Sequence, residues 1–391
     1  MNKKNNITQN NLVWIIFIII IIPVHLSYNN INDFTFDLIH YPSRGREFLF
    51  TLPISFFLAI PFMFLGLFNF YKDNEIFLLL VFILISLSSF LLYNDYSHVL
   101  LLLKITIPIL TLLGFEIFFK KRFTLIEKKN ISHIIKKYNY KIALIFMIVF
   151  FISIISPFYL DRQYDWLING ITIFDFHQYF PLIFILLLGV LASNKQKFVF
   201  LLVYILSFYL SYWTANQTFL LILILFGIYY IFNFLGSSIL WSSIFISIII
   251  LTIILYPLFV FLFYSELQQL DLPEKVIDGR FLLIHKFFNN LNFLDFLTPF
   301  RTSSEISSKF YHNEFVVIFS ALGFAGVVLF YFVILKRIWL ISKYFPHIAV
   351  SISLYSLLCG IVITVNLHPY TSIILSFFIS YYYILSKIKS Q

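Results

Sequence analysis

The chain has 391 residues, of which 61% are hydrophobic and 12% are charged, and its formal net charge is +9. Soluble globular proteins carry about 25% charged residues, so this composition excludes a water-soluble fold. Apolar runs of about 18 residues or more recur along the chain, and each can cross the ~30 Å hydrocarbon core of a bilayer.

These runs do not alternate between apolar and polar residues as the strands of a membrane barrel do. The sequence therefore predicts an all-α polytopic membrane protein, with residues 1–391 forming a single integral membrane domain. We expect the first run to be an uncleaved helix, because it lacks a signal-peptide cleavage pattern. About twelve spans are predicted, at residues 12–28, 48–70, 76–93, 99–119, 142–160, 178–193, 198–213, 218–235, 239–264, 314–335, 348–367 and 371–386.

The distribution of Lys and Arg sets the predicted orientation, because cytoplasmic segments are enriched in these residues. With both termini in the cytoplasm, the inner segments carry most of the basic residues and the outer segments most of the acidic ones. The basic segment 120–141 is then an anchor on anionic lipid. The positive net charge thus indicates contact with membrane lipid and not with nucleic acid.

Three predicted outer segments are longer than a tight turn: 29–47, 161–177 and 265–313. Long connections are often functional, and the last is the longest. Within it, apolar residues recur at steps of four and three, which predicts an amphipathic helix lying along the membrane interface. That stripe consists of Ile277, Phe281, Ile284, Phe288 and Leu291.

All five predicted outer arginines lie in these three segments. Arginine stays charged and binds phosphate through two parallel hydrogen bonds, so a lipid pyrophosphate is a candidate ligand. Pairing with nearby acids, or snorkelling at the interface, is the structural alternative. The sequence has no nucleotide-binding or metal-binding motif, so we expect neither a cofactor nor a metal. The five residues are Arg44, Arg46, Arg162, Arg280 and Arg301.

Other polar residues stand against apolar runs. His312 and Asn313 immediately precede the predicted tenth helix; histidine is the commonest general base, although an interfacial histidine often serves only as a structural donor. Lys104 and Glu116 fall within the fourth predicted span. They are too far apart to pair with each other, and each is close enough to a helix end to snorkel.

This arrangement resembles the O-antigen ligase/polymerase superfamily of bacterial envelope glycan assembly. The resemblance is carried by about a dozen spans with one dominant outer loop, by Gly279-Arg280, by the segment 312–315 that begins with His312-Asn313, and by the Gly-x-x-Gly of residues 323–326. Asn216 stands where many members carry an arginine, so Arg162 or Arg301 would take its place.

The resemblance implies an enzyme of the bacterial inner membrane with its active site facing the periplasm. Its substrate would be an oligosaccharide on undecaprenyl pyrophosphate. It would need no metal or nucleotide cofactor. A second protein that regulates chain length is a candidate partner. His312 would be the catalytic base and Arg280 would stabilise the leaving pyrophosphate. The other outer arginines, together with Asn313, would bind pyrophosphate or sugar.

Three activities fit this reading. We prefer an O-antigen polymerase, which joins repeat units on the lipid carrier, to a ligase, which moves the chain onto the lipid A core. The preference follows from the resemblance, because the chain is small, poor in glycine and divergent from the commoner ligase pattern, and in these features it resembles the polymerases. A lipid-linked oligosaccharide flippase, a transporter, is the alternative of another class, and it should show ionisable residues deep in its spans.

Overall fold

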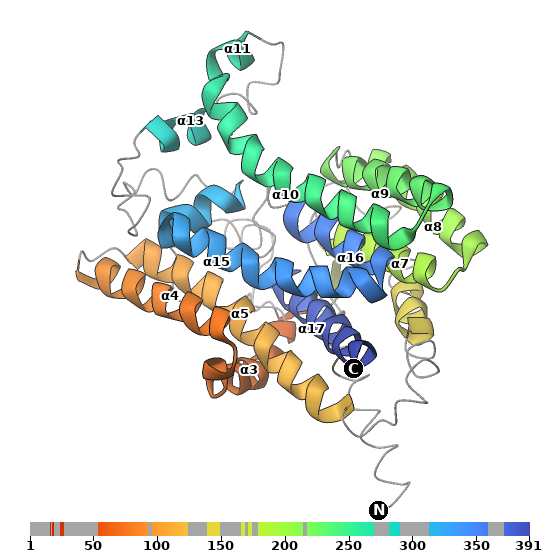
Figure 1. The fold of residues 1–391 in the computed structure, drawn as a ribbon, viewed down its shortest axis with the longest axis horizontal. Coiled ribbons are helices and arrows are strands. Elements are labelled where there is room, and N and C mark those ends of the chain that lie inside the picture. Colours follow the sequence, from red (N-terminus) through yellow and green to blue (C-terminus); the bar gives the residue numbers. More distant parts are fainter. Residues whose placement is uncertain are drawn as a thin grey trace, which may run out of the picture.

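The computed structural model describes residues 54–92, 96–123, 139–148, 179–213, 217–269, 281–289, 313–358 and 371–391, with a few short stretches nearer the N-terminus and at 166–168 and 171–173. In this part of the chain nearly all residues are helical (Figure 1). The helices are α3 (Ile54–Leu67), α4 (Asn74–Leu92), α5 (Tyr96–Phe123), α7 (Tyr179–Ser193), α8 (Lys197–Trp213), α9 (Gln217–Leu235), α10 (Ser238–Leu262), α11 (Tyr264–Gln268), α13 (Leu282–Asn289), α15 (Glu314–Tyr344), α16 (Pro346–Ser353) and α17 (Thr371–Ser390).

Five of the described helical segments are long and apolar enough to cross a membrane, and several shorter apolar helices accompany them. This confirms the predicted class, a helical membrane protein. The five segments are Leu101–Phe123, Thr218–Leu235, Ser238–Leu262, Glu314–Tyr344 and Thr371–Ser390.

A small antiparallel sheet was not predicted from the sequence. Its strands are β1 (Val24–Leu26), β2 (Trp166–Ile168) and β3 (Ile171–Ile173), in the order β1-β3-β2. The prediction of a helix over 12–28 is therefore wrong at residues 24–26. A strand of three residues is too short for apolar and polar alternation to mark it, so the sequence offered no clear signal for it.

One half of the core forms where α3 and α17 pack on α5. The approach of α3 to α5 is very close: a Cβ atom added at Gly66 would lie 2.1 Å from the Leu110 carbonyl oxygen, and one at Gly114 would lie 1.9 Å from that of Phe62. Small residues allow such backbone contact between membrane helices. The two glycines thus fix the spacing of this pair.

Serine hydroxyls join α17 to α5. Ser376 Oγ donates to the Pro108 carbonyl at 3.1 Å and Ser380 Oγ donates to the Leu112 carbonyl at 2.7 Å. These bonds satisfy buried hydroxyls between helices that have no water around them.

The other half of the core contains α7, α9, α10 and α16. There Tyr229 Oη lies 3.0 Å from His347 Nδ1.

The helix α15 is bent sharply at Gly323. This residue has φ 69° and ψ 179°, a backbone conformation that is essentially restricted to glycine. The Glu314 carboxylate also acts electrostatically on Tyr331, whereas a straight helix would separate these residues by about 25 Å. The piece 314–322 therefore folds back beside the piece 324–344, and the turn is visible at one end of α15 in Figure 1.

Candidate functional site

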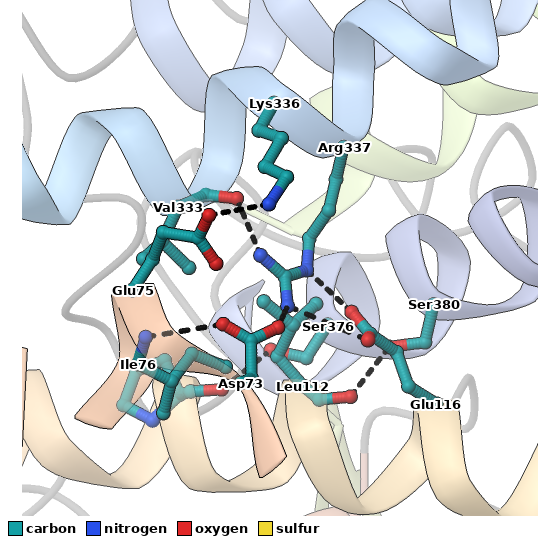
Figure 2. A network of polar contacts seen from close by, with 11 residues as sticks. Asp73, Glu75, Ile76, Leu112, Glu116, Val333, Lys336, Arg337, Ser376 and Ser380 are labelled. Carbon is teal, nitrogen blue, oxygen red and sulfur yellow. Dashed lines mark hydrogen bonds and ion pairs between the residues drawn. The ribbon is translucent and has the colours of Figure 1, made fainter. Parts of the chain in front are cut away.

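A buried network of charged side chains joins three helices (Figure 2). Arg337, near the end of α15, is fully buried. Its Nε donates to Glu116 Oε1 of α5, and its Nη2 donates to Asp73 Oδ2 at 2.9 Å and to Glu116 Oε2 at 3.4 Å. Its Nη1 donates to the Val333 carbonyl at 2.8 Å. One guanidinium thus holds two carboxylates that come from distant parts of the chain.

Local helix chemistry explains how the acids reach this position. Asp73 precedes α4, and its Oδ1 accepts a hydrogen bond from the Ile76 backbone N–H at 3.2 Å. This is an N-cap contact, and Asp is among the best residues for that position. Glu75 lies in the first turn of α4, where the helix dipole favours a negative charge, and it pairs with Lys336. The start of α4 therefore presents both acids to consecutive basic residues of α15.

The environment of the network differs from one side to the other. Lys336 and Glu75 have side chains that are 44% and 24% exposed, whereas Glu116 is 8% exposed. Tyr383 of α17 covers the guanidinium, with its ring centroid 5.3 Å from Arg337 Cζ. Partial burial raises the pKa of the Asp73 carboxyl, but the positive charge of Arg337 and the bond from Ile76 lower it more, so the net shift is downward.

This network corrects two expectations from the sequence. Glu116 does not snorkel, because it is buried and paired. The predicted tenth span ends at residue 335, which leaves Arg337 in a connection, but α15 continues to Tyr344 and includes Arg337. The sequence gives little indication of this network, because Arg337 is separated from Glu116 and Asp73 by more than two hundred residues. The start of α4 and the ends of α5 and α15 lie on the same side of the helix bundle, because ion pairs join them directly.

The second candidate region surrounds the described helix of the long segment 265–313, which the sequence predicts to be on the outer side. The helix α13 packs on α10 and on the first piece of α15. Ile284 and Phe287 are buried in these contacts, and the Phe287 ring meets that of Phe319 in α15 edge to face, with centroids 5.2 Å apart. His285 Nδ1 lies 3.3 Å from the Phe261 carbonyl of α10.

The amphipathic helix predicted in 265–313 is therefore present over Leu282–Asn289. Ile284 belongs to the predicted stripe and is buried, and Phe281 and Phe288 are partly buried. Phe287, which was not in the stripe, is more buried than Phe288, because α13 rests against protein on that side. Ile277 and Leu291 lie outside the described residues.

Most of the predicted site residues fall outside the described part of the chain. They are His312, Arg280, Arg301, Arg162, Arg44 and Arg46. Asn313 is described: it is buried and caps α15, with its Oδ1 accepting a hydrogen bond from the Val316 backbone N–H at 3.1 Å. The next residue, Glu314, is also buried.

No group of three or more metal-binding side chains occurs in the stretches that the structure describes. What the described residues offer is a guanidinium with two carboxylates at one place, and an aromatic and amide-bearing surface on α11 and α13 at the other. Comparison with protein-family models, with curated proteins and with solved structures finds no match to this chain.

Proposed function

We propose that this chain is a polymerase of surface polysaccharide, of the O-antigen type. It would be a glycosyltransferase that joins repeat units carried on undecaprenyl pyrophosphate. One observation supports it most. The helix α13 directly follows the stretch that contains Arg280, α15 begins just after His312, and the two helices are in contact through Phe287 and Phe319. The two proposed catalytic residues are thus attached to helices that touch.

The proposed reaction needs no metal. His312 accepts the proton of the acceptor hydroxyl, whose oxygen forms the new bond to the anomeric carbon of the donor sugar. The bond from that carbon to the pyrophosphate oxygen breaks, and its electron pair leaves with the pyrophosphate. Arg280 stabilises that charge. Arg301, Arg162, Arg44 and Arg46 are the further pyrophosphate ligands that we propose, and Asn313 is proposed to contact the sugar or the pyrophosphate.

We also propose the orientation and the location. The chain would have about twelve spans and cytoplasmic termini in the bacterial inner membrane, with the segment 265–313 in the periplasm. The ion network supports this, because the start of α4 and the ends of α5 and α15 meet at one side. These are the segments for which the positive-inside rule predicts the cytoplasmic face.

The test is a gel of lipopolysaccharide from source cells deleted for the gene. Plasmids supply wild type, His312→Ala, Arg280→Ala and, as a matched control in the same described helix region, Lys286→Ala. A core that carries a single repeat unit in the deletion strain and in the first two variants supports the polymerase. Full-length ladders with His312→Ala at normal protein level would remove His312 from the mechanism.

The same gel separates the other candidates. Bare core with long chains held on the lipid carrier indicates a ligase. Bare core with single units trapped inside the cell indicates a flippase. The ion network is the observation that favours the flippase, since Arg337 and Glu116 are buried ionisable groups of the kind that a transporter needs. An unchanged ladder refutes the O-antigen proposal in that strain.

A further inference from the structure

The end of α10 passes from an apolar surface to a polar one. Leu262 and Phe263 are exposed apolar residues, and they continue a stripe of exposed apolar side chains along α10. Ser265, Glu266 and Gln268 of α11 are exposed polar residues. Exposed apolar side chains of a membrane helix face lipid, and aromatic residues collect at the interface. The change at 263–265 therefore marks the depth of the lipid headgroups.

At this depth α11 and α13 bring four side chains together. The Tyr264 ring stacks on the His285 ring, with centroids 4.4 Å apart and planes 20° apart. Gln268 Nε2 donates to Tyr264 Oη at 3.0 Å, and Asn289 Nδ2 lies 2.7 Å from His285 Nε2. The Phe261 carbonyl can only accept, so the hydrogen bond between it and His285 is donated by Nδ1.

Other side chains supply the apolar packing that holds α13 in place. Ile284 and Phe287, on the other side of the helix, are the residues that bury it against α10 and α15. Gln268 and Asn289 are exposed, and the Tyr264 and His285 rings are only partly covered. The result is a stacked pair of aromatic rings with one side-chain amide beside each ring. The exposed amides of Gln268 and Asn289 can form hydrogen bonds with groups at headgroup depth.

We propose that Tyr264, Gln268, His285 and Asn289 form a binding surface for the sugar of a lipid-linked glycan. This rests on the proposed function and locates where its glycan would lie. A sugar ring has apolar C–H faces, which pack on aromatic rings, and hydroxyls at its rim, which both donate to and accept from amides. A glycan held to the membrane by its lipid presents these groups at headgroup depth.

The test uses full-length protein in lipid nanodiscs. The probe is the lipid-linked glycan extracted from cells deleted for this gene, and the reference is the same extract after mild acid has released the glycan. Bound lipid is measured by mass spectrometry. Wild type should prefer the intact lipid. In the variant Gln268→Ala/Asn289→Ala, the preference for the intact lipid should fall about tenfold, as expected for the loss of two hydrogen bonds. Gln269→Ala, an exposed neighbour, should retain it.

Each outcome decides something. If the double variant binds the intact lipid as wild type does, the surface is overturned while the wild-type preference still supports the proposed function. If wild type shows no preference for the glycan, both proposals fail. Tyr264→Phe keeps the ring stack and the fold but removes the hydroxyl, and it should weaken the preference by about threefold. An unchanged preference in that variant counts against Tyr264.

Discussion

Replacing Arg337 with methionine should destabilise the protein more than any other single change in the ion network. Arg337 is fully buried, and it is hydrogen bonded to both Glu116 and Asp73. Methionine fills a similar volume but leaves the Glu116 carboxylate buried without its cation. Removal of one partner from a buried ion pair costs about 3–5 kcal/mol, because the remaining charge is neither solvated nor neutralised.

The assay is the free energy of unfolding of the purified protein in mixed micelles, titrated with a denaturing detergent. The matched control is Lys336→Met, at the neighbouring position of the same helix. Its pair with Glu75 is partly exposed to solvent, so the loss should be at most about 1 kcal/mol. Glu116→Gln in the Arg337→Met background should restore about 1–3 kcal/mol, because the uncompensated charge is removed.

Two results would refute this reasoning. The first is an Arg337→Met variant that loses no more stability than Lys336→Met. The second is strict additivity of Arg337→Met and Glu116→Gln. Either would mean that the contact between α5 and α15 is maintained by apolar packing alone. The proposed function can be followed in the same variants: a structural role of the network predicts that the proposed glycan synthesis follows protein level, whereas a transport role predicts lost activity at normal protein level.

Four further predictions concern other described residues. The lowered pKa of Asp73 stabilises the fold above the ordinary carboxyl range, and this stabilisation is lost as pH falls through the folded-state value, so Asp73→Asn should reduce the loss of stability below about pH 4 in an unfolding series. Gly323→Ala should cost about 1–3 kcal/mol, because alanine is strained at φ 69°; an unchanged unfolding midpoint would contradict the bend. Asn313→Ala should cost about 1 kcal/mol through loss of the helix cap, while Asn313→Ser should keep the stability, so that any loss of glycan synthesis in the serine variant points to ligand contact. Replacing Ser376 and Ser380 together with alanine should cost about 1 kcal/mol in the same titration, and no loss would show that packing alone joins α17 to α5.

Where a hydrophobic run ends at polar residues, the sequence predicted the ends of the helix accurately. The predicted spans 178–193 and 218–235 correspond to α7 and α9 within a residue at each end. Hydrophobicity and turn residues are local properties, so they can be read along the chain. The Gly-x-x-Gly of residues 323–326 was noticed as a motif, but the sequence did not reveal that Gly323 divides α15 in two. Glycine permits a positive φ without requiring it.

The candidate site was less accessible to this kind of reading. The roles of Arg280 and His312 follow from a resemblance and from their place in a long segment, and both remain predictions. The Arg337 network was missed because a basic residue near the end of an apolar run is normally assigned to the adjoining connection. Only the distances from the Arg337 guanidinium to the carboxylates of Glu116 and Asp73 distinguish an ion pair from separately solvated charges.

By itself, the sequence determined that this is a helical membrane protein, because 61% hydrophobic residues in long runs have no stable arrangement in water. It also determined which segments carry positive charge. The tertiary structure alone decided that α15 folds back at Gly323, that α13 rests on α10 and α15, and that Arg337 meets two acids from elsewhere in the chain. Partition between lipid and water depends on a residue and its neighbours in sequence, whereas an ion pair depends on the separation of two atoms in space.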